Sequence, residues 1–278
     1  TLFMVGGSLP IAIGLLVTAF LPESLEFLVR RSADPERIRR IVSRIAPNVA
    51  ADSNIQLRVD EKQLSGVPVK HLFSEGRAFT TVLLWVLFFF SFYLLWIVLA
   101  WAPTLLKKSG ATVQQYSLGF ACIMFGSLVA TITIGRMMDR FDPFRSLKIV
   151  YVLAFISMVA FGFTANNPFI IVAVMSVIMG IFVFGGNSGL VALATVSYPL
   201  DIRASGIGWA YAVGKIGSLL APVAGGFVLS LNWSVSMICA INGSAALFIT
   251  VAIFILQKHL AAARHKEVVQ QDAPKQVA

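Results

Sequence analysis

The chain has 278 residues, of which 58% are hydrophobic and only 13% are charged, and its formal net charge at pH 7 is +9. An ordinary soluble domain has about 25% charged residues, so a soluble fold of this length could not bury so much apolar surface. The apolar residues also fall in runs of about 20 or more, the length that a helix needs to cross the ~30 Å hydrocarbon core of a bilayer. The composition therefore excludes a soluble domain and predicts an all-α, polytopic membrane protein.

Seven apolar runs are long enough to be membrane-spanning helices. We expect them at 1–21, 78–106, 113–135, 148–165, 168–197, 204–230 and 234–256. Cys122 and Cys239 both fall inside these runs without metal-ligand spacing, so they are expected to be packing residues. No metal or cofactor is expected.

Lys and Arg are distributed unevenly among the connections. In chain order the six connections hold ten, two, four, none, one and none, and the segment after the last run holds four. By the positive-inside rule the basic segments, 22–77 and the tail 257–278 among them, are expected to be cytoplasmic, in a multi-pass protein of the inner (plasma) membrane. This topology explains most of the net charge, so no nucleic-acid partner is expected.

The same orientation places the first residue outside. An outside start, no initiator Met and a long basic loop before six helices form the pattern of the C-terminal part of a twelve-helix transporter. We therefore expect transmembrane helix six at 1–21, a cytoplasmic loop at 22–77, a six-helix domain at 78–256 and a tail at 257–278. Within the loop, 34–46 has the spacing of an amphipathic helix on the membrane surface.

Lys215 lies about eleven residues into the run that begins at Ala204, or ~16 Å along a helix, which is near the bilayer centre. A central charge costs about 2.5–3.5 kcal/mol on insertion scales, so this ammonium is expected to face a cavity or a partner. All 13 Asp and Glu residues fall outside the predicted spans. The counter-charge of Lys215 would therefore come from a preceding half of the transporter, from water or from an anionic substrate. The alternative is a purely structural lysine.

Other polar residues are predicted at a similar depth. Tyr211 lies one turn before Lys215 on the same helix face. Asn187 lies about ten residues, or ~15 Å, from the cytoplasmic end of its run, and an interhelical packing bond is the alternative for it. Tyr93 and Trp96 carry donors that need partners when buried. Lipid-facing phenylalanines and interfacial tryptophans are expected to account for most of the aromatic residues around them.

The sequence GRMMDRFDPFR at 135–145 is a candidate gating motif. Gly135 would permit close helix approach, and Asp139 is surrounded by basic residues that include Arg140 and Arg145. An ordinary positive-inside loop is the alternative.

Taken together, these stretches resemble the major facilitator superfamily. Its aromatic acid:proton symporter branch is most similar, on Pro-Glu-Ser at 22–24 followed by FLVRR, on Gly135, Asp139 and Arg140, and on YPLDIRASGIGWAYAVGKIGSLLAPVAGG at 198–226. Lys215 stands where that branch usually has arginine. The resemblance implies a twelve-helix fold, of which this chain covers the part from helix six onward. It also implies that Asp139 pairs with neighbouring charges to hold the cytoplasmic side shut.

The resemblance implies a secondary active transporter, not an enzyme, that takes up an aromatic carboxylate with protons by alternating access. In this hypothesis Lys215 attracts the carboxylate, Asn187 and Tyr211 are polar contacts, and Tyr93 and Trp96 lie beside the ring. The expected partners are a small anionic substrate, protons and the lipid bilayer, and the full-length protein is expected to be a monomer. A sugar or drug porter of the same superfamily and an inactive membrane scaffold or sensor are the alternatives. No embedded Asp, Glu or His accounts for proton coupling, which the resemblance assigns to a preceding first helix.

Overall fold

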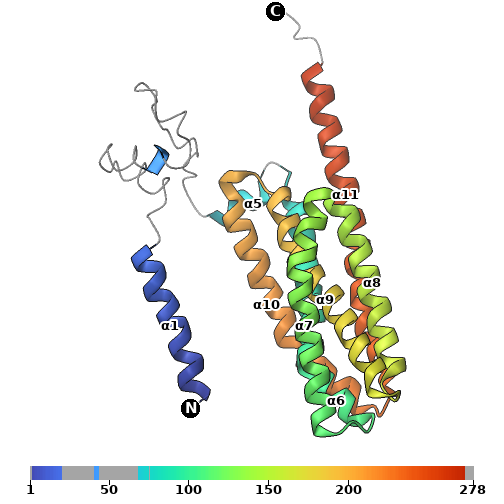
Figure 1. Ribbon diagram of the computed structural model, residues 1–278. Helices are drawn as coiled ribbons and strands as arrows, with labels where there is room; N and C mark the ends of the chain where they lie inside the picture. Colours follow the sequence, from blue (N-terminus) through green and yellow to red (C-terminus); the bar gives the residue numbers. More distant parts are fainter. Residues whose placement is uncertain (1, 21–40, 44–67, 75, 273–278) are drawn as a thin grey trace, which may run out of the picture. The chain divides into compact units, whose positions relative to one another are not determined.

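The computed structural model describes residues 2–20, 41–43, 68–74 and 76–272. The chain divides into two compact units, 1–62 and 63–278. The first contains α1 (Leu2–Phe20), and the second contains the short α5 (Pro68–Phe73) and six long helices (Figure 1). Every regular element within these described ranges is a helix, which confirms the predicted all-α class.

The six long helices of the second unit all contain a stretch that is long and apolar enough to cross a membrane. They are α6 (Ala78–Lys108), α7 (Val113–Arg140), α8 (Pro143–Thr164), α9 (Phe169–Ser197), α10 (Leu200–Ser230) and α11 (Val235–Asp272). The prediction of a multi-pass membrane protein is therefore confirmed. In α1 the apolar helical stretch is Pro10–Phe20, which is shorter than these six, so a seventh span there stays a prediction.

Several helices continue beyond the apolar runs that predicted them. The α7 helix reaches Arg140 and the α11 helix reaches Asp272, well past the predicted ends at 135 and 256. An apolar run marks the part of a helix inside the bilayer, whereas caps decide where the helix begins and ends. At α8, Asp142 is the N-cap and accepts a hydrogen bond from the Arg145 backbone N–H at 2.7 Å, with Pro143 at the first helical position.

Much of the predicted cytoplasmic loop lies outside the described residues. Residues 41–43 are helical. The remainder of the amphipathic helix predicted at 34–46 and the Pro-Glu-Ser sequence at 22–24 fall among the residues that are not described.

The long helices form a bundle held by successive pairwise contacts. The α7 helix packs on α9, α9 on α8, α8 on α11, α11 on α6 and α6 on α10, while α6 also contacts α7 and α9. Figure 1 shows these helices running alongside one another, with α11 continuing past the end of α8. The α7 and α10 helices, both described over their whole length, do not contact each other and are the two ends of this series.

Glycines bring the helix backbones together in two of these pairs. Between α7 and α9, a Cβ on Gly126 would meet the Val177 carbonyl oxygen, and Gly180 makes the reciprocal approach to α7. Between α6 and α10, a Cβ on Gly217 would meet the Phe89 carbonyl oxygen. Lipid tails supply no hydrophobic driving force between helices, so small residues that allow close backbone approach are the usual basis of such contacts.

Candidate functional site

Three successive residues near the middle of α6 each connect that helix to a different part of the bundle. Ser91 accepts hydrogen bonds from α8 and α9, the Phe92 ring lies against α10, and the Tyr93 hydroxyl donates to α11. Successive helix residues point about 100° apart, since 3.6 residues make one turn. The α6 helix therefore brings side chains from four other helices to one level of the bundle.

Lys215 is the middle residue of the 31-residue helix α10, and its side chain is exposed. Its Nζ lies 5.2 Å from the centroid of the Phe92 ring and 6.0 Å from that of the Trp96 ring. Both distances fall within the ~6 Å range of cation–π attraction. The structure thus brings Lys215 and Trp96 together, with Phe92 as a contact that the sequence analysis did not select.

Lys215, Phe92 and Trp96 form one cluster with the ring of Tyr211, which we call the Lys215 cluster. The centroid of that ring lies 5.4 Å from those of Phe88 and Phe92, and it meets both rings edge-on. Phe88 is fully buried and Phe92 is 5% exposed, so the expectation that most phenylalanines of this helix face lipid does not hold for these two. The four-residue spacing of Phe88, Phe92 and Trp96, which places them on one helix face, is the signal that could have found them.

The aromatic rings offset only part of the cost of the central charge. A cation–π contact contributes about 0.5–1 kcal/mol at an exposed site, so the two rings beside the exposed Lys215 contribute about 1–2 kcal/mol together. A lysine at the centre of a membrane helix costs about 2.5–3.5 kcal/mol. Within the described residues Lys215 forms no ion pair, so its ammonium remains available to an anion.

Asn187 reaches the same level of α6 from α9 but uses its amide inside the bundle. Its Nδ2 donates to Ser91 Oγ at 3.0 Å, and the Tyr151 hydroxyl donates to the same oxygen at 2.8 Å. Tyr151 is fully buried, whereas Asn187 is half-buried. The packing bond that was the alternative for Asn187 is therefore present. Ser91 and Tyr151 are members of this polar cluster that the sequence analysis missed.

Tyr93 is not part of the Lys215 cluster. Its hydroxyl donates to Asn242 Oδ1 of α11 at 2.7 Å, and Asn242 Nδ2 donates to the Ile238 carbonyl at 2.9 Å. Asn242 is 4% exposed. The predicted donor of Tyr93 has thus found its partner in the packing of α6 against α11.

An apolar cavity lies between α6, α8, α9, α10 and α11. Its lining includes Trp101, Met158, Phe161 and Cys239, with Asn242 as a polar contributor. No charged side chain lines it, so it offers nothing to balance the charge of a carboxylate.

The predicted gating residues lie at the basic end of α7 and the start of α8. Gly135, Asp139, Arg140 and Arg145 are all exposed. A Cβ on Gly135 would meet nothing within 4 Å, so the expected close helix approach is absent from the described structure. Within these described helices Asp139 forms neither a hydrogen bond nor an ion pair, while neighbouring Asp142 caps α8.

Tyr198 fixes the connection between α9 and α10 at the same end. It is 2% exposed, the Arg203 Nε donates to its carbonyl oxygen at 3.3 Å, and a Cβ on Gly206 would approach its ring to 2.6 Å. A phenol is neutral at physiological pH at its ordinary pKa, and burial raises the pKa of Tyr198 further, with Thr81 lowering it in part. Arg203 and Gly206, at the start of the 198–226 segment, therefore both contact Tyr198 in the packing of this connection.

Comparisons with known proteins agree with this architecture. The family model described as Major Facilitator Superfamily matches residues 84–277. The 4-hydroxybenzoate transporter PcaK of Acinetobacter baylyi is 32% identical over 259 residues, which cover 92% of this chain and 56% of that protein. The gallate transporter of Pseudomonas putida is 29% identical over 254 residues, covering 91% of this chain and 56% of the relative. The benzoate transport protein of Acinetobacter baylyi is 27% identical over 235 residues, covering 83% and 49%.

The chain thus spans about half the length of the curated relatives it matches. These relatives are named as transporters, which confirms the expectation that the chain is not an enzyme. They also confirm the resemblance to the aromatic acid branch that the motifs indicated. Family model and relatives together show that the chain belongs to the Major Facilitator Superfamily.

Proposed function

We propose that this chain provides the carboxylate-binding site of a secondary active transporter for aromatic carboxylates. The observation that carries the proposal is Lys215, an ammonium group at the middle of a membrane helix with aromatic rings beside it and no carboxylate partner among the described residues. Such a charge is costly, and in membrane proteins it marks a substrate or ion pathway more often than a packing position.

The surroundings of Lys215 match both parts of an aromatic carboxylate. The Lys215 ammonium supplies a charge-assisted hydrogen bond for the carboxylate. The exposed Trp96 ring and the half-buried Tyr211 ring supply surfaces against which the substrate ring can stack or meet edge-on. A neutral sugar has no charge to pair with the Lys215 ammonium, so the cluster favours an aromatic acid.

Asn187 and Tyr93 have different places in the proposal. Asn187 is half-buried and its Nδ2 is held by Ser91, which leaves its Oδ1 as the group for a substrate hydroxyl or a bound water. The Tyr93 hydroxyl is committed to Asn242. We therefore assign Tyr93 to holding α6 in position rather than to direct substrate contact.

The transport cycle that we propose is proton-coupled uptake by alternating access. It rests on the resemblance to the aromatic acid:proton symporters, with the residues at 135–145 acting as a gate on the cytoplasmic side. The basic end of the bundle is taken as cytoplasmic by the positive-inside rule, in the inner membrane. We propose that the full-length protein works as a monomer.

Uptake of radiolabelled 4-hydroxybenzoate and benzoate by cells that produce the full-length protein tests the proposal. We expect proton-dependent uptake of both acids by the wild type, and uptake near background for Lys215→Met at equal protein level in the membrane. Neutral sugars and cationic dyes, tested in parallel, should not be transported. Undiminished uptake by Lys215→Met would remove Lys215 from the substrate site, and transport of a sugar or dye alone would contradict the substrate class.

A further inference from the structure

A pair of basic side chains meets one aromatic ring elsewhere on the bundle, where α8 packs against α11. The Nζ of Lys148 lies 5.5 Å from the centroid of the Phe254 ring, and the Nζ of Lys258 lies 4.6 Å from the same centroid. Phe254 is 47% exposed, so this cluster lies on the surface of the bundle. Two like charges therefore share one ring at a surface position.

Neither ammonium is neutralised within the described residues. Lys148 donates to Gln257 Oε1 at 2.8 Å, which is a neutral acceptor. Neither Lys148 nor Lys258 forms an ion pair with any carboxylate in that part of the chain. Both Nζ atoms lie within 5.5 Å of one ring centroid, so the two cations repel each other, and the repulsion is stronger where water is partly excluded. The cluster thus lacks an anion that would relieve the repulsion.

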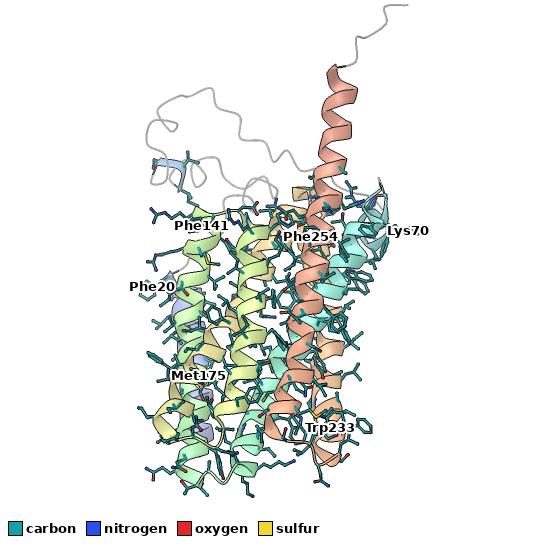
Figure 2. The ribbon with its side chains drawn as sticks, turned by 90° about the vertical axis from the view of Figure 1, so that its right-hand side faces the viewer. Phe20, Lys70, Phe141, Met175, Trp233 and Phe254 are labelled. Carbon is teal, nitrogen blue, oxygen red and sulfur yellow. The ribbon has the colours of Figure 1, made fainter. Side chains whose placement is uncertain are left out.

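The position of the cluster indicates which kind of anion can reach it. Figure 2 shows Phe254 at the same end of the bundle as Lys70 and Phe141, and away from Trp233. Lys258 lies just past residue 256, where the predicted apolar run ends, and close to the end of the candidate membrane span Val235–Ala262 of α11. The cluster therefore lies where a membrane helix leaves the hydrocarbon core and enters the headgroup region.

Apolar side chains continue from the cluster toward the middle of the same helices. Val152 lies one turn further along α8 from Lys148 and is 37% exposed. Val251 lies one turn back along α11 from Phe254 and is 58% exposed. Side chains three or four residues apart share a helix face, so each lysine lies above an apolar surface suited to an acyl chain.

We propose that Lys148, Lys258 and Phe254 form a binding site for the phosphodiester headgroup of an anionic phospholipid. The two ammonium groups donate hydrogen bonds to the phosphate oxygens, and the flexible lysine stems allow both to reach one phosphate. The Phe254 ring keeps the two cations together before the lipid arrives, and the exposed faces of α8 and α11 receive its acyl chains. This site is independent of the proposed substrate site at Lys215.

Thermal unfolding of the purified full-length protein in detergent micelles tests the site when phosphatidylglycerol is titrated in. We expect phosphatidylglycerol to raise the midpoint of unfolding, and phosphatidylcholine and inorganic phosphate to leave it nearly unchanged. Removal of each lysine should weaken the apparent affinity for phosphatidylglycerol about fivefold, the factor that corresponds to about 1 kcal/mol per basic residue near an anionic surface.

The variants are Lys258→Gln, the double variant Lys148→Gln/Lys258→Gln, and Lys258→Arg, which should retain the affinity. Lys107→Gln is the matched control, because Lys107 is an exposed lysine in the last turn of α6, at the end of the bundle away from Phe254. Unfolding midpoints equal to that of the wild type in the absence of lipid establish that the variants are folded. If the double variant does not fold, Lys258→Gln alone tests the proposal. An unchanged phosphatidylglycerol response in Lys258→Gln would overturn the proposal, as would an equal response to inorganic phosphate or an equal loss in Lys107→Gln.

Discussion

The Tyr151 hydroxyl donates a hydrogen bond of 2.8 Å to Ser91 Oγ in the centre of the bundle. Tyr151 is fully buried and Ser91 is 1% exposed, so water does not compete for this bond. The same Ser91 oxygen accepts from Asn187. One small hydroxyl thus joins α6, α8 and α9 at the level where Phe92 meets Lys215.

Ser91→Ala is expected to destabilise the bundle by about 1–3 kcal/mol, because it leaves the buried Tyr151 hydroxyl and the Asn187 amide without their acceptor. Thermal unfolding in detergent measures the effect. Ser157→Ala is the matched control. Ser157 lies in α8 and is buried like Ser91, but its hydroxyl donates only to the Ala154 carbonyl of its own helix. Equal losses of stability in the two variants would show that the interhelical bonds contribute nothing particular.

Gly217→Ala is expected to separate α6 from α10 and lower the unfolding temperature, because the added Cβ would meet the Phe89 carbonyl and approach the Tyr93 backbone nitrogen to 3.3 Å. Gly208→Ala, on the same helix, is expected to be neutral or slightly stabilising, since nothing lies within 4 Å of its added Cβ. Replacing a helical glycine by alanine otherwise gains about 0.8–1 kcal/mol. A Gly217→Ala protein as stable as Gly208→Ala would contradict the close packing of these helices.

How far the sequence could predict this structure depends on the kind of interaction. Hydropathy located the six described spans and the position of Lys215 in the middle of one of them, because the cost of placing charge in hydrocarbon depends mainly on position along the helix. It could not show that Phe88 is buried while Trp96 is exposed, since both are apolar and only the packing partner distinguishes them.

The polar contacts were harder to predict. Tyr93 and Asn187 were selected as candidate substrate contacts because a buried donor needs a partner, but the sequence alone could not tell a substrate from another helix. Their partners, Asn242 and Ser91, lie 149 and 96 residues away in the chain. Which side chains meet across such separations is decided by how the helices pack.

Asp142→Ala is expected to destabilise the first turn of α8 by about 1 kcal/mol, because it removes the side chain that accepts from the Arg145 backbone N–H. Asp142→Asn should retain most of the stability, since an amide oxygen can accept the same bond. Hydrogen exchange at the start of α8 is the suitable measurement. Unchanged exchange in Asp142→Ala would mean that the cap is not formed in the membrane.

Trp96→Leu is expected to raise the KM for an aromatic acid about 3- to 10-fold, because it removes a ring beside Lys215 and such ring pairs contribute about 0.5–1.5 kcal/mol. Trp96→Phe should lie closer to the wild type. Trp209→Leu is the control, as Trp209 is an equally exposed tryptophan that stacks on Trp85 and not on the Lys215 cluster. A loss of the same size in Trp209→Leu would show that the effect is not specific to the cluster.

The central claim is that the charge of Lys215 recognises the charge of the substrate. Competition of benzoate and of the neutral isostere benzamide against labelled 4-hydroxybenzoate, in the wild type and in Lys215→Arg and Lys215→Gln, measures this directly. We predict that the wild type and Lys215→Arg prefer benzoate by about 10- to 100-fold, the range expected of a hydrogen bond to a charged group, and that the residual binding of Lys215→Gln shows no such preference. A Lys215→Gln protein that still prefers benzoate as strongly as the wild type would contradict the claim.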